Sequence, residues 1–119
     1  MTKIQSNQHF KYEFFDKYVI VEAFKGTIVD QEAAHVTLQT IVEHYKGKEF
    51  TLISHRVNDY VIGMDAYSSK IFKKIRSLAI VSENPEVKRN ALLEQDKYDN
   101  SFAFFTCLEE AKNWADSFN

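Results

Sequence analysis

The stretch SLAIV, residues 77–81, decides the fold class. It is short and continuously apolar, as a β-strand is when both faces of its sheet are covered. Such strands are typical of parallel sheets, in which helical connections lie on the two faces. We therefore expect Ala79 and Ile80 to be among the most buried residues of the chain.

The segments on either side of this strand alternate between strand and helix patterns. Residues 49–55, EFTLISH, and residues 101–105, SFAFF, have the composition of strands, whereas residues 64–75 and 84–95 have that of helices. Asn84 is placed to cap the second of these helices, and Pro85 occupies its first position. Strands that alternate with helices predict parallel neighbours joined by right-handed crossovers.

Residues 9–26, HFKYEFFDKYVIVEAFKG, predict two antiparallel strands that turn at Asp16 and Lys17. In the first strand, Lys11 and Glu13 alternate with aromatic residues. One face of this strand is therefore expected to be more exposed to solvent, which indicates a place near the sheet edge.

Two further helices show clear signals. In residues 30–48, Asp30 can cap the start, Gly47 lies where a helix commonly ends, and a stripe of apolar residues faces the core. That stripe consists of Ala34, Leu38, Ile41 and Tyr45.

In residues 106–118, Thr106 and Glu109 have capping-box spacing. The apolar face of this last helix consists of Leu108, Ala111, Ala115 and Phe118, with Trp114 on its flank and expected to be partly buried.

The resulting order is β-β-α-β-α-β-α-β-α in one α/β domain, residues 1–119. We expect a mixed sheet of about five strands, the N-terminal one antiparallel at an edge, with four helices. The chain has 119 residues, of which 45% are hydrophobic and 27% charged, as in globular domains.

Net charge, cysteine content and the distribution of apolar residues indicate which partners and which cellular compartment to expect. The net charge of −2 gives no general attraction to nucleic acid or an anionic membrane. The single cysteine forms no internal disulfide, which fits a reducing compartment. The start, MTKIQSNQ, has no signal-peptide pattern, and no apolar run approaches the roughly 20 residues that cross a bilayer. We therefore expect a cytoplasmic protein without membrane insertion.

Two long stretches carry a family resemblance. Residues 24–42, FKGTIVDQEAAHVTLQTIV, and residues 102–118, FAFFTCLEEAKNWADSF, are similar to the strand–glycine turn–helix and the closing strand–helix of STAS domains. STAS domains include the bacterial anti-sigma factor antagonists, and the resemblance covers nearly the whole chain. It implies a STAS-like (SpoIIAA-like) fold and a non-enzymatic regulatory or interaction module that binds a protein partner or a small anionic ligand.

The resemblance also draws attention to the expected helix at residues 64–75. Antagonists of this family are phosphorylated on a serine at the start of the second helix, within an Asp-Ser-Ser/Thr-Gly pattern. Here Asp65, Ser68 and Ser69 are present, but the spacing is longer and Lys70 follows where the family has glycine. We predict a contact surface at these four residues rather than a phosphorylation switch. The simpler alternative is that the serines only begin the helix, with the lysines in solvent.

A second candidate site follows the strand at residues 49–55. Ligands of open α/β sheets bind at the carboxyl ends of the strands, and the polar residues there are Ser54, His55, Arg56, Asn58 and Asp59. A small enzyme using His55 as acid or base, oriented by Asp59, is the alternative function. Hydrogen bonding within the loop is the simpler interpretation. Ser54 and His55 point to opposite faces of a strand, so they form no nucleophile–base pair.

No catalytic, metal or cofactor motif is present. His9, His35, His44 and His55 lack metal-site spacing, and the chain has no CxxC, HExxH, G-x-G-x-x-G or P-loop. We expect no metal and no cofactor. Cys107 lies at the start of the last helix, a position that can favour a thiolate, but two glutamates follow it and oppose one. A structural role is expected for this cysteine.

Overall fold

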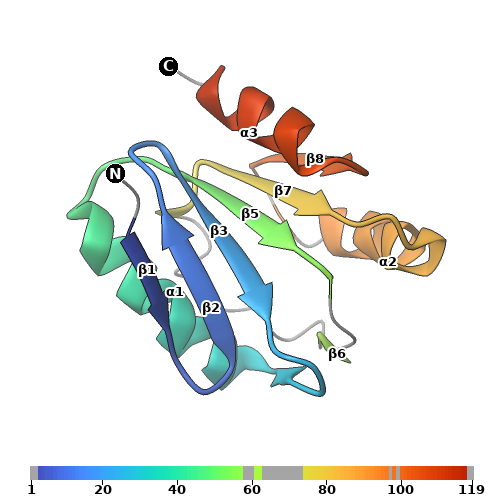
Figure 1. Ribbon diagram of the computed structural model, residues 1–119, viewed down its shortest axis with the longest axis horizontal. Coiled ribbons are helices and arrows are strands. Elements are labelled where there is room, and N and C mark those ends of the chain that lie inside the picture. The colour runs from blue at the N-terminus through green and yellow to red at the C-terminus, as the bar shows by residue number, and fades with distance from the viewer. Residues whose placement is uncertain (1–2, 58–60, 63–73, 97, 99, 118–119) are drawn as a thin grey trace.

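The computed structural model describes residues 3–57, 61–62, 74–96, 98 and 100–117. A six-stranded mixed sheet forms its centre, with the strand order β1-β2-β3-β5-β7-β8 (Figure 1). These strands are β1 (Lys3–Ser6), β2 (Phe10–Phe14), β3 (Tyr18–Ala23), β5 (Thr51–His55), β7 (Ser77–Val81) and β8 (Ser101–Phe105). Beside this sheet, β4 (Ile28–Val29) pairs in parallel with β6 (Val61–Ile62). The helices are α1 (Gln31–Tyr45), α2 (Pro85–Gln95) and α3 (Leu108–Asp116).

The N-terminal part of the sheet differs from the prediction. β1, β2 and β3 form an antiparallel meander, whereas β5, β7 and β8 continue from β3 in parallel. The sequence prediction had five strands and missed β1, because its residues KIQS lack apolar alternation and Ile4 is exposed. An edge strand forms through backbone hydrogen bonds and needs no buried side. β2 is therefore second from the edge.

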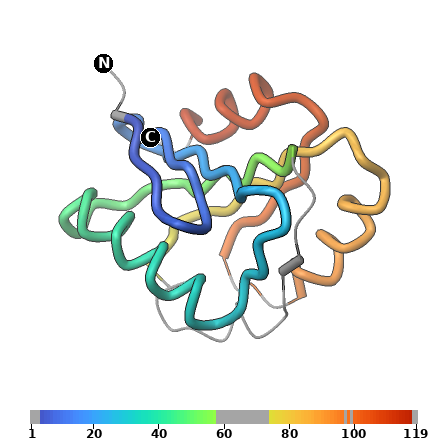
Figure 2. The backbone as a smooth tube through the Cα atoms, turned by 60° about the horizontal axis from the view of Figure 1, so that its bottom comes forward, coloured from blue at the N-terminus to red at the C-terminus, as the bar shows by residue number. Residues whose placement is uncertain are grey.

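Helices cover both faces of the sheet. α1 and α2 lie on one face and α3 on the other (Figure 2). β7 contributes to both cores: Leu78 packs with the α1 side, and Ala79 and Val81 pack with α3. All five residues of β7 are buried, with Ala79 and Ile80 at 0% exposure, which confirms the prediction from SLAIV.

The described residues of the two predicted helix stripes also face the cores, whereas Phe118 of the last stripe lies outside the described residues. On the buried side of α1 lie Ala34, Leu38, Ile41 and Tyr45. Trp114 of α3 is partly buried, as predicted, with its ring centroid 5.8 Å from that of Phe105.

Helix ends follow local side-chain chemistry at two of three starts. Asp30 accepts a hydrogen bond from the Ala33 amide at 2.9 Å, and Asn84 accepts one from the Glu86 amide at 2.9 Å. Both caps agree with the sequence prediction. The capping box predicted for α3 was wrong, because the N-cap is Cys107, which makes no side-chain cap hydrogen bond. The observed N-cap lies one residue after the predicted one, Thr106, so the spacing from the N-cap to Glu109 does not fit a capping box.

Three helices are present in the described part of the chain, where the sequence predicted four. The remaining expected helix, residues 64–75, falls almost entirely outside the described residues. None of the described helices has the length and apolar content needed to cross a membrane.

Candidate functional site

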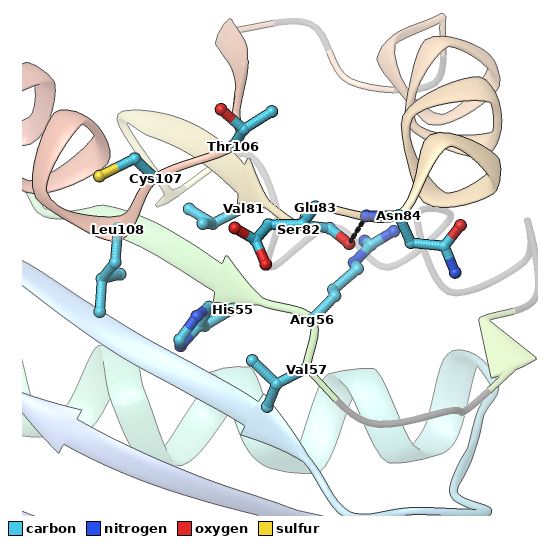
Figure 3. Close-up of a pocket in the computed structure, with 10 residues that line it drawn as sticks. All are labelled: His55, Arg56, Val57, Val81, Ser82, Glu83, Asn84, Thr106, Cys107 and Leu108. Carbon is cyan, nitrogen blue, oxygen red and sulfur yellow. Dashed lines mark hydrogen bonds between the residues drawn. The ribbon is translucent and has the colours of Figure 1, made fainter.

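An open hollow of about 520 Å³ lies at the carboxyl ends of β5, β7 and β8 (Figure 3). Three short segments line it, one after each strand. They are His55, Arg56 and Val57; Val81, Ser82, Glu83 and Asn84; and Thr106, Cys107 and Leu108. Because the last two segments lead into α2 and α3, the hollow lies between the starts of two helices on opposite faces of the sheet.

Arg56 is directed away from the solvent and into a buried ion pair. Its Nη1 and Nη2 atoms donate to the two carboxylate oxygens of Glu94 on α2, both at 2.6 Å. The Arg56 side chain is 6% exposed and that of Glu94 is 0% exposed. Arg56 Nε also donates to Ser54 Oγ at 3.1 Å. The carboxylate of Glu94 neutralises the arginine charge inside the protein. The Arg56–Glu94 ion pair thus links β5 to α2 and acts as a clamp between them.

His55 belongs to a row of polar side chains on the other face of the sheet. Its Nδ1 lies 3.1 Å from Glu22 Oε1 on β3, and the second oxygen of Glu22 lies 3.6 Å from Lys11 Nζ on β2. The His55 and Glu22 side chains are 21% and 25% exposed, so water reaches the pair. With its proton on Nδ1, His55 donates to Glu22, and Nε2 then carries a free lone pair.

Ser54 and His55 use opposite faces of β5, as their adjacent positions predicted. Ser54 accepts a hydrogen bond from Arg56 on the α2 side, whereas His55 contacts Glu22 on the α3 side. Cys107 is exposed, and its sulfur points away from His55 (Figure 3). Ser54 and Cys107 therefore form no nucleophile–imidazole pair with His55. Among the described residues, no group of three or more His, Cys, Asp or Glu side chains is arranged to hold a metal ion.

The rim beside α2 is built by local hydrogen bonds. Ser82 Oγ accepts from the Asn84 amide at 3.1 Å, and the Asn84 side chain then caps α2. The Ser82 amide donates to Phe105 O at 3.0 Å, which fixes this rim against β8.

A second hollow of about 480 Å³ lies at the start of α1 and is lined in part by Asn7, His9 and Asp30. Asn7 Oδ1 accepts from the amides of His9 and Phe10, and Asp30 caps α1. These side chains therefore serve the turn and the helix start.

Of the site residues predicted from sequence, the structure places Ser54, His55 and Arg56 at the end of β5. Six others lie outside the described residues: Asn58, Asp59, Asp65, Ser68, Ser69 and Lys70. The sequence interpretation missed Glu22 and Glu94, which hold His55 and Arg56. Glu22 had a detectable signal, since it is the one charged residue in the strand YVIVEA. Glu94 follows Ala91 by three residues on the buried face of α2.

No family model matches the chain, and no curated protein matches it. A solved structure does match: the crystal structure of an uncharacterised protein of the DUF3478 family from Shewanella loihica PV-4, which has a SpoIIAA-like fold. The two chains are 15% identical, the match covers 97% of this chain and 92% of the other, and the TM-score is 0.62.

The fold is SpoIIAA-like. This confirms the fold class expected from the strand and helix order and from the STAS resemblance. In the SpoIIAA-like arrangement of this chain, the three parallel strands β5, β7 and β8 all end at the hollow (Figures 1 and 3).

Proposed function

We propose that this chain is a non-enzymatic regulatory or interaction module of STAS type. Its protein partner or small ligand binds at the carboxyl ends of the parallel strands. The observation that carries this proposal is the open hollow of about 520 Å³ between the starts of α2 and α3. In open α/β sheets, this is the end at which ligands bind.

The chemistry of the lining supports recognition rather than bond breaking. Arg56 is paired with the carboxylate of Glu94, and Ser54 accepts a hydrogen bond from Arg56. The Cys107 sulfur points away from His55. The surface left for a partner combines the imidazole of His55 with Thr106 and the apolar side chains of Val57 and Leu108. Such a mixture of shape, a few polar groups and apolar area is typical of binding sites.

Native mass spectrometry of the protein purified from its own host tests the proposal. We expect a protein or small molecule to co-purify with the wild type. Val57→Lys places a long charged side chain at the rim of the hollow, where Val57 is 58% exposed, and should remove the bound species.

Leu93→Lys is the matched control, because Leu93 is 57% exposed on α2 and does not line the hollow. This variant should retain the bound species. Retention by Val57→Lys, or equal loss from both variants, would contradict binding in the hollow, as would the absence of any bound species from the wild type.

One observation favours a second function, a small enzyme that uses the same hollow. Glu22 lies 3.1 Å from His55 Nδ1, which is how a carboxylate orients a histidine that exchanges protons. The sequence alternative gave this orienting role to Asp59, which lies outside the described residues. In the enzyme proposal Glu22 takes it.

The two functions differ in what happens to a co-purified small molecule. An enzyme would convert it during incubation, and His55→Ala would stop the conversion. A binding module would release the same compound unchanged, and mass spectrometry of the compound before and after incubation distinguishes these results.

A further inference from the structure

The outer edge of β8 has backbone groups of known direction that pair with no other described strand. Among the described strands, β8 has one neighbour, β7, and lies at the end of the sheet opposite β1 (Figure 1). Phe105 O accepts a hydrogen bond from the Ser82 amide at 3.0 Å, so the backbone groups of Phe105 face β7. Because successive residues of a strand face alternate sides, Ala103 also faces β7, whereas the N–H and C=O groups of Phe102 and Phe104 face outward.

The sequence SFAFF is self-complementary about its centre. If a second β8 pairs antiparallel with Ala103 on the two-fold axis, each Phe102 lies opposite Phe104 of the other copy. Both of these residues direct their backbone groups outward, so they exchange N–H···O=C bonds in the hydrogen-bonded type of antiparallel pair. Ala103 meets its own copy in the closer, non-hydrogen-bonded type, where a small side chain fits.

The side chains agree with this register. Phe102 packs against the core on the α1 side, and the Phe104 ring lies 6.0 Å from Lys88 Nζ of α2, so both phenylalanines are on the same face. The register therefore forms two aromatic cross-strand pairs on one face, a favourable arrangement. One helical turn after Lys88, Leu92 is 58% exposed and extends the apolar surface.

The sequence of β8 itself also lacks the residues that normally prevent pairing. Natural edge strands carry charges, proline or bulges that block a second strand. β8 contains neither a charged residue nor proline, whereas β1 at the other edge carries Lys3. The side chains of β8 itself therefore bring no like charges together when the strand meets its own copy.

We propose that β8 pairs antiparallel with β8 of a second copy of this chain, centred on Ala103, to form a symmetric dimer with a continuous sheet. A two-fold contact of this kind closes on itself, so assembly stops at the dimer. The surface is separate from the hollow proposed as the ligand site, and its test is independent of that function.

Disulfide trapping tests the register directly. In a Cys107→Ser background, Ala103→Cys places two thiols on the two-fold axis. The Cα atoms of a non-hydrogen-bonded pair are about 4.5 Å apart, within the range of a disulfide. Mild oxidation should therefore give mostly covalent dimer. Ser101→Cys in the same background is the control, because its two copies would be on the order of 13 Å apart and should stay unlinked.

Sedimentation velocity over a dilution series tests the association without cross-linking. The wild type should sediment as a dimer at high concentration. Phe104→Lys places a charge beside the outward backbone groups and should raise the dimer dissociation constant at least about tenfold. Ile4→Lys adds the same charge at the β1 edge and should change nothing.

Three results would overturn the proposal: a wild type that is monomeric throughout the series, equal cross-linking of Ala103→Cys and Ser101→Cys, or dissociation caused by Ile4→Lys. The last would indicate that β1, and not β8 alone, takes part in the contact between copies. Circular dichroism verifies that Phe104→Lys is folded. If that variant does not fold, the wild-type sedimentation and the disulfide pair still decide the proposal.

Discussion

Arg56 and Glu94 form a bidentate ion pair inside the protein, with both nitrogen–oxygen distances at 2.6 Å. The pair joins the carboxyl end of β5 to α2, two elements that are 38 residues apart in the sequence. Two parallel N–H···O bonds fix the orientation of the planar guanidinium group as well as its position. The clamp therefore sets the geometry of the chain at the floor of the hollow.

Removal of one partner of the Arg56–Glu94 clamp should lower the free energy of unfolding. Glu94→Ala leaves a buried guanidinium without its carboxylate, and we expect the free energy of unfolding to fall by about 3–5 kcal/mol in urea denaturation. Glu86→Ala, at an exposed position of the same helix, is the control and should cost about 1 kcal/mol or less. A loss from Glu94→Ala as small as that of the control would show that Arg56 finds water or another acceptor.

The same clamp predicts recovery when both charges are removed. Arg56→Met combined with Glu94→Leu replaces the ion pair with apolar side chains of similar size. Because the cost of desolvating two charges disappears, the double variant should be more stable than Glu94→Ala alone. Urea denaturation of the three proteins under one buffer condition measures this difference.

Trp114 should contribute less to stability than a fully buried tryptophan. It is partly buried against Phe105, whereas Ala111 and Ala115 of the same helix are at 0% exposure. We expect Trp114→Ala to lower the free energy of unfolding by about 2–3 kcal/mol, below the range for a completely enclosed ring. The exposed neighbour Asn113 provides the control as Asn113→Ala. A loss of less than about 1 kcal/mol from Trp114→Ala would mean that α3 docks through its alanines alone.

Buried tyrosines predict a loss of stability at alkaline pH. Burial raises the pKa of Tyr98 to about 12, an increase that a side-chain hydrogen bond from Asn100 partly offsets. Tyrosine in an unfolded chain has a pKa near about 10. Above that pH the unfolded state loses its proton first, so the free energy of unfolding falls as the pH rises from about 10 to about 12.

Urea denaturation across this pH range measures the effect. Burial raises the pKa of Tyr45 in the same direction, so the decline has more than one source. Tyr98→Phe loses the hydrogen bond to Ile75 O and should be less stable near neutral pH, but its stability should decline less steeply above pH 10. An unchanged slope in Tyr98→Phe would contradict the assignment.

Ser68 and Ser69 lie outside the described residues, and the prediction for them rests on the sequence. We expect no phosphate at either serine in protein from the native host, as measured by intact mass. Ser68→Asp should change stability by no more than about 1 kcal/mol near a helix start, and should weaken binding of an anionic ligand. Ser68→Ala should affect neither. A stoichiometric phosphate at either position would instead establish a switch.

Local signals were sufficient for much of the fold. SLAIV predicted a strand covered on both faces, and Asp30 and Asn84 marked two helix starts, because burial patterns and caps depend on residues close together in the sequence. The prediction failed where local signals were absent or misleading. β1 has no apolar alternation, and the α3 start lies at Cys107, one residue beyond the expected capping box.

The sequence by itself determined five strands of the main sheet and the three described helices in their order, and from them the sheet end at which a site was predicted. The tertiary structure alone decided the partners of that site: Glu22 for His55, and Glu94 for Arg56. It also decided that β1 and β8 are the two edge strands of the six-stranded sheet. The physical reason is that strand order and register bring together residues that are 33 and 38 positions apart, and no local pattern records such a pairing.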